Sequence, residues 1–387
     1  MTSKPDLLVR NLLASARRVN AAIISGATIV CLLIFYGCEA PDTPDYQTAR
    51  PTVGFYHWQQ TLRPDSLPLH LLEEPELFVK CFDVTWSGGR PEAVAQLEIE
   101  YKDEGAPLPF RIVPVVFITN EVMRRVSNDG SMELAQNILL LLDNLLGYQT
   151  CPACPQGGRG SSAGESPQSS SYRELQIDCD WTAGSRKSYF KFLSDLKSLL
   201  PEEVTLSVTV RLHQFRDRKA QGIPPADRGS LMVYNVGDLN RWETENSIID
   251  SNITTNYLTN AGQGEYPLAL DLALPLYQWG AVYRQGKLAY LIDELGVDDL
   301  SDSLRFESLN QHRYFVSQKT YLDGYLLYSG DNIRLESSPY GTLSAVAKQL
   351  SIVPSFEEQR LLFYRIGSEL SETTSASKLR NLSHSIR

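Results

Sequence analysis

The sequence predicts an α/β protein in which eight strands alternate with helices. Short apolar runs rich in β-branched and aromatic residues recur along the 387 residues. Amphipathic helical patterns fall between several of these runs, and such alternation implies a parallel sheet. Eight parallel strands are the number that closes a (β/α)8, or TIM, barrel, and the chain length is typical of one such barrel with insertions.

The predicted strands have the composition of buried strands and end in polar or aromatic residues. They are residues 52–58, 77–86, 110–119, 173–181, 204–212, 230–238, 268–277 and 361–367. The predicted helices are residues 131–146, 185–200, 247–258 and 343–350. An open doubly wound sheet is the alternative. It would need a glycine-rich phosphate turn after the first strand, and the residues after Trp58 (QQTLRPDS) contain no glycine.

Two long connections interrupt the predicted barrel domain, residues 52–370. Residues 148–171 are rich in Gly and Ser and predict a flexible insertion between the third and fourth strands. Residues 300–340 predict a β-rich insertion between strands seven and eight, with turns at Asp323-Gly324 and Gly330-Asp331. We expect residues 38–51 to be a linker and residues 371–387 to be a C-terminal tail.

The N-terminus has the pattern of an export signal. Residues 1–37 contain a basic flank and then an uncharged apolar run, which a polar stop follows. Gly37-Cys38 is a combination at which bacterial lipoprotein signals are cut, so we expect a lipid anchor on Cys38, although Phe35 and Tyr36 are bulkier than usual there. The run is also about long enough to span a bilayer. A single N-terminal transmembrane helix is therefore the alternative. Both interpretations place the remaining chain at the cell envelope, exported and anchored to a membrane.

Composition and cysteine spacing exclude several classes of partner. Lys and Arg number 36 against 46 Asp and Glu, a net charge of −10, and without a long basic run this argues against nucleic acid. Cys151 and Cys154 form a CxxC pair without further zinc ligands at matching spacing, so we predict a local disulfide. Cys81 and Cys179 lie in apolar patterns and are predicted to be buried thiols. We expect no metal and no cofactor.

The residues at the carboxyl ends of barrel strands predict the functional site. The fourth strand ends in Asp178-Cys179-Asp180-Trp181, and strand alternation makes Asp178 and Asp180 face the same way. Two carboxylates at a barrel mouth repel each other without an obvious structural purpose, so we predict that both are catalytic. The alternative is that one Asp caps the helix that begins near Ser185 and the other pairs with an arginine.

Other residues near the strand ends are predicted to bind substrate, because aromatic rings stack on the apolar faces of sugars and polar groups bond hydroxyls. They are His57, Trp58, Asp83, Trp86, Trp181, Tyr234, Asn235, Tyr277 and Trp279. For each aromatic residue the alternative is packing in the core. For His57 it is a structural hydrogen bond.

Three segments resemble family 18 glycoside hydrolases, the group of chitinases and endo-N-acetylglucosaminidases. Residues 177–181 (IDCDW) resemble a strand-four signature that ends in Asp-x-Asp-Trp-Glu. Residues 232–235 (MVYN) resemble a strand-six Met-x-Tyr-Asp segment, and residues 272–277 (LALPLY) a strand-seven Gly-x-Pro-x-Tyr-Gly segment. The whole chain also resembles bacterial exported barrel proteins considered glycosidase-like. The resemblance implies a TIM barrel and a glycan partner, and it makes Asp180 the residue that orients the acetamido group.

One departure from the family leaves catalysis open. Thr182 stands where the family has the glutamate that protonates the leaving oxygen, and a hydroxyl cannot deliver that proton. Asn235 likewise stands in place of the strand-six Asp. The chain is then either a glycoside hydrolase with a non-standard general acid or a non-catalytic glycan-binding or structural envelope protein. A hydrolase would need a second carboxylate. The candidates are Asp83, Glu121, Glu243 and Glu245.

Overall fold

The computed structural model describes residues 50–100, 108–147, 172–261 and 266–386. The predicted export signal, Cys38, Cys151 and Cys154 lie outside these residues. No helix within them has both the length and the apolar character that a membrane span requires.

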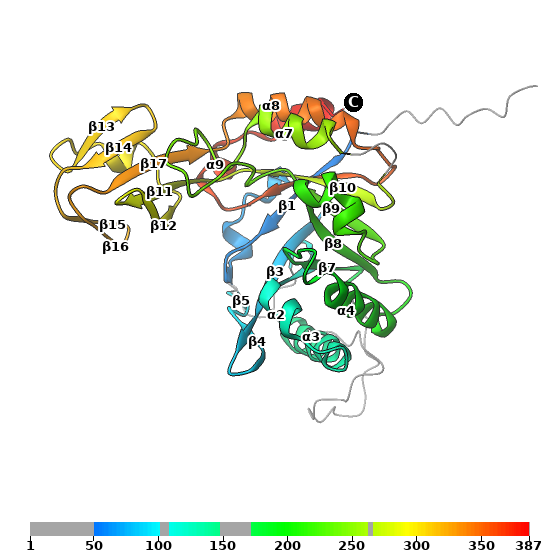
Figure 1. Cartoon of the computed structure of the whole chain (residues 1–387). Helices are drawn as coiled ribbons and strands as arrows, with labels where there is room; N and C mark the ends of the chain where they lie inside the picture. The colour runs from blue at the N-terminus through cyan, green and yellow to red at the C-terminus, as the bar shows by residue number, and fades with distance from the viewer. Residues whose placement is uncertain (1–49, 101–107, 148–171, 262–265, 387) are drawn as a thin grey trace, which may run out of the picture. The chain divides into compact units, whose positions relative to one another are not determined.

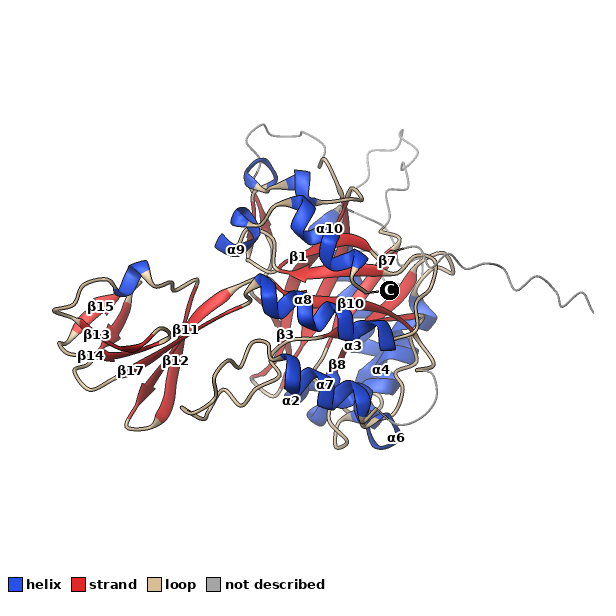
Figure 2. Cartoon of the chain, turned by 90° about the horizontal axis from the view of Figure 1, so that it is seen from above, coloured by secondary structure: helices blue, strands red, loops and turns tan. Residues whose placement is uncertain are grey.

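Eight parallel strands close into a barrel, which Figure 2 shows as red strands with blue helices around them. Around the barrel the order is β1, β18, β10, β9, β8, β7, β6 and β3, and pairing between β1 and β3 closes it. The strands are β1 (Thr52–His57), β3 (Glu76–Ser87), β6 (Arg111–Ile118), β7 (Glu174–Asp178), β8 (Thr205–Arg211), β9 (Arg228–Met232), β10 (Ala269–Pro275) and β18 (Arg360–Tyr364). Each overlaps one of the eight predicted strands, so the predicted fold class is confirmed.

Helices follow the later strands, and Figure 1 labels most of them. They are α2 (Asn120–Arg125), α3 (Gly130–Leu146), α4 (Arg186–Leu199), α5 (Leu212–Arg216), α6 (Arg218–Gln221), α7 (Ser251–Thr259), α8 (Tyr340–Gln349), α9 (Glu369–Thr373) and α10 (Ala376–His384). All four predicted helices form. Helix α7 starts later than predicted because the Asp250 side chain accepts the backbone N–H of Ile253 and caps it there. Residues 371–387 were expected to be a tail, but α10 buries Leu379 and Leu382 in the main core.

The first two strands depart from the strand-helix rhythm. Strand β1 is followed by two short 3₁₀ turns, η1 (Pro64–Ser66) and η2 (Leu69–Leu71), and by the short β2 (Thr61–Leu62), which pairs with β5 (Glu98–Ile99). Strand β3 continues past the barrel and turns back as β4 (Arg90–Val94), which ends the sheet.

A β-rich insertion lies between β10 and α8, coloured yellow to orange in Figure 1. Its antiparallel sheet has the order β12 (Lys287–Asp293), β11 (Gln278–Arg284), β17 (Asn332–Ser337), β14 (Arg313–Val316) and β13 (Phe306–Asn310). A hairpin of β15 (Thr320–Leu322) and β16 (Tyr325–Leu327) joins it, and Asp323 and Gly324 form its turn with φ angles of 47° and 78°. The sheet begins at Gln278, earlier than the predicted residue 300.

A buried carboxylate connects the insertion with a loop of the barrel. Glu336 on β17 accepts hydrogen bonds from Arg334 Nε at 2.5 Å and Trp279 Nε1 at 2.8 Å. The hydroxyl of Ser247, which follows β9, also donates to Glu336. The insertion therefore depends on polar contacts with the barrel as well as on its own apolar core.

Charged residues fill the amino-terminal end of the barrel. Arg360 on β18 donates to Glu174 at 2.8 and 3.0 Å and to Asp271 at 2.5 and 2.9 Å. Arg228 on β9 binds the same Asp271 carboxylate at 2.7 and 2.8 Å. Asp271 is fully buried, and these two guanidinium groups compensate its carboxylate.

Candidate functional site

A cavity of about 250 Å³ opens where the barrel strands end. Its lining combines aromatic rings, carboxylates and one guanidinium. The lining residues are Tyr56, Trp58, Asp83, Phe117, Asp178, Asp180, Thr209, Arg211, Met232, Tyr234, Asn235 and Tyr364. Both predicted catalytic acids thus face one cavity, together with Trp58, Asp83, Tyr234 and Asn235 from the predicted binding set.

Strand alternation explains how β7 and β8 supply the polar groups. Gln176 and Asp178 point inward from β7, while Ser207, Thr209 and Arg211 do so from β8. At the mouth, the Thr209 hydroxyl donates to Asp178 Oδ1 at 2.6 Å. Deeper in the barrel, Gln176 Nε2 donates to Ser207 Oγ at 3.3 Å. Gln176 and Asp178 therefore each have a hydrogen-bond partner on the neighbouring strand β8.

Asp180 and Arg211 form a bidentate ion pair at the rim of the cavity. Arg211 Nε donates to Asp180 Oδ1 at 2.5 Å and Nη2 to Oδ2 at 2.6 Å. This is the arginine pairing that the sequence left open as the alternative for one of the two acids. The other acid, Asp178, bonds Thr209 and does not cap helix α4. Thr182 and Ser185 form their own turn at the start of that helix instead.

Gln214 holds the ends of both strands that carry this ion pair. Its Nε2 donates to the Trp181 carbonyl at 2.9 Å, and its Oε1 accepts the Arg211 backbone N–H at 2.7 Å. The side chain is buried, with an exposed fraction of 1%. The side-chain amide of Gln214 therefore fixes the backbone at both members of the ion pair, next to Asp180 and at Arg211.

Asp178 is the acid whose environment most favours protonation. Burial, and after it the nearby negative charge of Asp180, raise its pKa to about 6. This value already includes the opposing effects of the Thr209 hydrogen bond and the positive charge of Arg211. Asp178 can therefore hold a proton at mildly acidic pH while it lines the cavity.

A β-bulge brings Asp83 into the cavity beside Lys80. The register of β3 against β6 shifts between Lys80 and Phe82, so Lys80 and Asp83 share the inner face. Lys80 Nζ lies 2.9 Å from Asp83 Oδ1 and 5.7 Å from the centre of the Trp58 ring. Asp83 is thus a carboxylate of the cavity that already has a cationic partner.

Aromatic rings form one wall of the cavity. Tyr364 stacks on Tyr234 with ring centres 5.4 Å apart, and its ring lies edge-on to Trp58, also at 5.4 Å. The Tyr56 hydroxyl donates to Gln176 Oε1 at 2.8 Å. Burial raises the pKa of Tyr56, Tyr234 and Tyr364, which keeps these phenols neutral.

Two predicted binding residues support the wall from behind. The Tyr277 hydroxyl donates to Asn235 Oδ1 at 2.8 Å, and Asn235 has a positive φ of 53° after the end of β9. The Trp279 ring lies 5.2 Å from the Tyr277 ring, while its indole N–H binds Glu336. Neither Tyr277 nor Trp279 is among the lining residues of the cavity.

Two predicted binding residues, His57 and Trp181, are buried outside the cavity. His57 alternates with the inward Tyr56 and therefore points out of the barrel, where burial lowers its pKa to about 4. Trp181 is fully buried and stacks on Tyr189 at 5.3 Å. Trp181 therefore matches its alternative of packing in the core, and His57 is buried away from the cavity.

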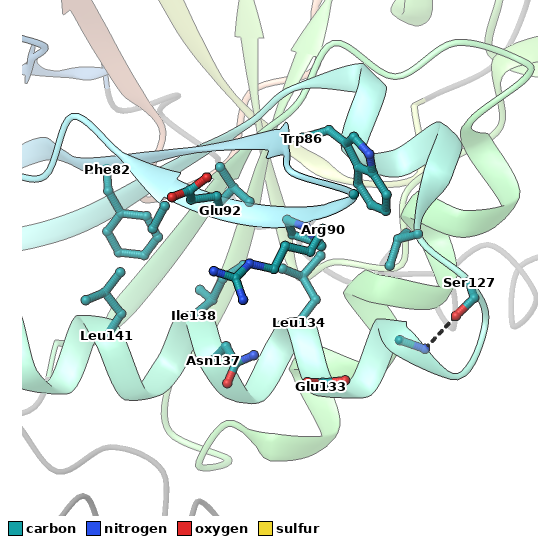
Figure 3. A pocket seen from close by; sticks show the side chains of 16 residues that line it. Phe82, Trp86, Arg90, Glu92, Ser127, Glu133, Leu134, Asn137, Ile138 and Leu141 are labelled. Atoms are coloured by element: carbon teal, nitrogen blue, oxygen red, sulfur yellow. Dashed lines mark hydrogen bonds between the residues drawn. The ribbon is translucent and has the colours of Figure 1, made fainter.

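Trp86 lies in a separate groove between the β3–β4 hairpin and α3 (Figure 3). Figure 3 shows Trp86 together with Leu134 and Ile138 of α3 around this groove, which has a volume of about 530 Å³. Strand β3 has left the barrel by this point and pairs with β4, so Trp86 cannot reach the mouth.

Of the candidates for a second acid, the structure brings only Asp83 to the cavity. Glu121 pairs with Arg125 on the surface, and Glu245 pairs with Arg313. Glu243 lines a different cavity. Thr182 is exposed, and its backbone N–H donates to Ser185 Oγ at 2.9 Å. It does not line the site.

The sequence interpretation missed six lining residues. They are Tyr56, Phe117, Thr209, Arg211, Met232 and Tyr364. A signal for two of them is present, because Ser207, Thr209 and Arg211 place polar side chains at every second position of a strand predicted to be buried. Among the described residues, no three His, Cys, Asp or Glu side chains are grouped as metal ligands would be.

Solved structures with a similar fold are chitinases and related enzymes. A chitinase from Bacteroides thetaiotaomicron has a TM-score of 0.50 at 9% identity, over 87% of this chain and 97% of that one. A chitinase from Chromobacterium violaceum gives 0.48 at 11% identity, over 85% and 99% of the two chains. The spore cortex-lytic enzyme SleL from Bacillus cereus gives 0.47 at 15% identity, over 87% and 75%.

The predicted resemblance to the barrel of family 18 glycoside hydrolases is thereby confirmed at the level of fold. No protein-family model matches the chain, and no curated protein does so either. At these identities the similarity concerns the fold alone.

Proposed function

We propose that the barrel mouth binds one sugar ring of a glycan. The observation that carries this proposal is the lining of the cavity, where Trp58, Tyr234 and Tyr364 offer rings for stacking and Asp83, Asp178 and Asp180 offer acceptors for hydroxyl groups. The volume of about 250 Å³ is below that of pockets for drug-sized ligands and suits a single ring.

The charges in the cavity favour an uncharged sugar ring as the ligand, because two of the three acids already have cationic partners. Lys80 pairs with Asp83, and Arg211 pairs with Asp180. Asp178 is the remaining acid, and its raised pKa lets it donate a hydrogen bond when protonated. Neutral hydroxyl and amide groups can therefore enter without leaving a buried charge unpaired.

Binding of neutral oligosaccharides by the purified chain tests this proposal. A glycan array would identify a ligand, and titration calorimetry would measure its affinity. We expect Trp58→Ala to weaken binding about tenfold, because a lost ring stack costs about 1.4 kcal/mol or somewhat less. Trp86→Ala is the matched control, because Trp86 lies in the separate groove. The affinity of this variant for the glycan should equal that of the parent chain. Equal affinity of both variants would contradict the proposal.

Hydrolysis is the second candidate, and the raised pKa of Asp178 favours it. A glycosidase needs one carboxyl group that stays protonated and a second that is ionised. Asp178, with a pKa of about 6, has the properties of the acid, and Asp83 beside Lys80 is the second carboxylate. This arrangement would replace the glutamate that is absent at Thr182.

Release of reducing sugar from the glycan identified above tests this second candidate. Asp178→Asn should abolish release while the variant keeps a melting temperature at least as high as that of the parent chain. Asp83→Asn should reduce release at least a hundredfold and also lower the melting temperature, because Lys80 loses its partner. Binding without any release by the parent chain would leave glycan recognition as the function.

We also propose that the chain is held at the cell envelope through Cys38. The support is the sequence of residues 1–38, with its basic flank, apolar run and terminal Gly37-Cys38. Incorporation of labelled palmitate into the chain, lost in Cys38→Ala, tests a lipid anchor. A chain that stays in the membrane fraction without label would have an uncleaved helix instead.

A further inference from the structure

Two segments next to the cavity carry positive charge on a chain whose net charge is −10. Residues 182–187 follow β7, and residues 211–222 follow β8. Their basic residues, which we call the basic rim, are Arg186, Lys187, Arg211, Arg216, Arg218 and Lys219. Asp217 is the single acidic residue in the two segments. Because both segments follow carboxyl ends of strands, they lie at the same end of the barrel as the cavity.

The two segments pack against each other. Arg186 Nη1 donates to the Ala220 carbonyl at 2.6 Å, and the Trp181 indole N–H donates to the Gln221 carbonyl at 3.3 Å. Gly222 permits this approach, because a Cβ there would lie 2.9 Å from Arg186 Cδ. The basic rim is therefore one surface, although its residues come from two separate parts of the sequence.

Part of this charge is not neutralised. Arg211 pairs with Asp180, and Arg216 pairs with Asp217. Within the described parts of the chain, Arg186, Lys187 and Lys219 have no carboxylate within ion-pair distance, and both lysines are exposed. This unpaired charge gives the surface a positive potential beside the mouth of an acidic protein.

Two arginines of the basic rim contact aromatic rings. The Arg216 guanidinium lies 4.7 Å from the centre of the Tyr257 ring, and that of Arg218 lies 5.9 Å from the Phe215 ring. Stacking of this kind limits the conformations of a guanidinium, so less entropy is lost when it binds an oxyanion.

Arg211 connects the basic rim with the cavity, because it belongs to both. A ligand whose first ring occupies the cavity would continue outward past this residue. Guanidinium groups bind carboxylate, sulfate and phosphate oxygens with paired hydrogen bonds. Charge complementarity and continuity with the cavity therefore point to the same ligand.

We propose that the glycan is anionic, with a carboxylate, sulfate or phosphate on a sugar unit outside the cavity, and that the basic rim binds this group. The proposal rests on the proposed function and names its substrate class. It requires the neutral ring in the cavity and the charged group to belong to one molecule.

Retention of the full chain on immobilised heparin, a sulfated and carboxylated glycan, tests the basic rim. We expect retention at low salt despite the acidic net charge. Lys187→Glu/Lys219→Glu should weaken heparin binding roughly tenfold or more at about 0.1 M salt and flatten its salt dependence. Lys287→Glu/Lys348→Glu is the matched control, because it reverses two exposed lysines elsewhere with the same change in net charge and should bind as the parent chain does.

Three results would overturn the proposal. The first is equal heparin retention of the two double variants, and the second is no retention of the parent chain. The third is a rim-dependent loss of binding to phosphatidylglycerol vesicles without any loss on heparin, which would assign the rim to a membrane surface. Failure of the cavity proposal is detected separately, through neutral oligosaccharides and Trp58→Ala. If the chain binds neutral oligosaccharides normally but the basic rim does not bind heparin, the proposal of an anionic glycan is refuted and the cavity proposal stands.

Discussion

Asp180 and Arg211 face each other from the ends of two neighbouring strands, with both carboxylate oxygens bound by the guanidinium at 2.5 and 2.6 Å. The pair sits at the rim, with side-chain exposures of 43% and 24%. In the cavity, this arginine already occupies the hydrogen-bonding positions of one of the two acids. Its removal should therefore change the electrostatics of the whole cavity.

Arg211→Met should raise the pKa of Asp178 above its value of about 6, because the guanidinium charge lowers that pKa. Carboxyl chemical shifts from NMR, followed across a pH titration, measure the change. Arg216→Met breaks a comparable pair with Asp217 on the surface and should leave Asp178 unchanged. Coincident titration curves for the parent chain and Arg211→Met would show that the two groups are not coupled.

The protonation of Asp178 should make stability depend on pH. Its pKa in the folded chain, about 6, lies above the ordinary value of 3.8, so the folded state binds this proton more tightly than the unfolded state. The contribution is fully present below about pH 4 and is lost as pH rises through 6. The free energy of unfolding should fall by roughly 2 kcal/mol over this interval.

Asp178→Asn removes this titration and isolates its effect. The variant should lose the fall in stability between pH 4 and 6 and be more stable than the parent chain at pH 7, measured by denaturant unfolding. Asp217→Asn changes an exposed carboxyl whose pKa Arg216 lowers, so it should preserve the downward slope. A parental slope in Asp178→Asn would assign the pH dependence to another group.

Gln214 should matter for both stability and ligand affinity. Gln214→Leu leaves the buried Trp181 carbonyl and the Arg211 N–H without their partner, which costs about 1 to 3 kcal/mol. Because the ends of β7 and β8 then loosen, glycan affinity should fall as well. Gln214→Glu keeps the acceptor for Arg211 but cannot donate to Trp181, so its affinity should be intermediate. A loss of stability with unchanged affinity would limit Gln214 to a structural role.

The charged cluster at the amino-terminal end should be sensitive to Arg360. Arg360→Met removes a partner from the fully buried Asp271 and from Glu174, and breaking a buried ion pair costs about 3 to 5 kcal/mol. Arg360→Met/Asp271→Asn should recover part of this loss. Arg111→Met breaks a contact of 3.8 Å with Glu76 on a half-exposed side chain and should change the free energy of unfolding by less than about 1 kcal/mol. Equal effects of both single variants would contradict this assignment.

The barrel could be predicted from sequence because each strand is buried on both faces and carries a strong local signal. The β-rich insertion was only partly predictable. Its turn at Asp323-Gly324 has a distinctive residue pair, whereas β11 follows β10 without any turn signal between Pro275 and Gln278. A long apolar stretch of this kind does not reveal where one sheet ends and the next begins.

The candidate site was predictable wherever a residue lies inside a regular strand. Asp178 faces the cavity as alternation requires, and Arg211 could have been found in the same way. The alternation of inward and outward side chains no longer predicts direction after a β-bulge or a strand that leaves the barrel, because the sequence gives no signal for either. The bulge in β3 turns Asp83 inward, and the hairpin that follows carries Trp86 to a different surface.

Gln176 joins three strands in the barrel interior below the cavity. Its amide oxygen accepts from Tyr56, while its amide nitrogen donates to Ser230 at 3.1 Å and to Ser207 at 3.3 Å. The side chains of these four residues are thus joined to one another by hydrogen bonds across the barrel interior. A ligand in the cavity would therefore meet a hydrogen-bonded layer beneath it, and any further units of an oligomeric ligand would extend toward the outside of the barrel.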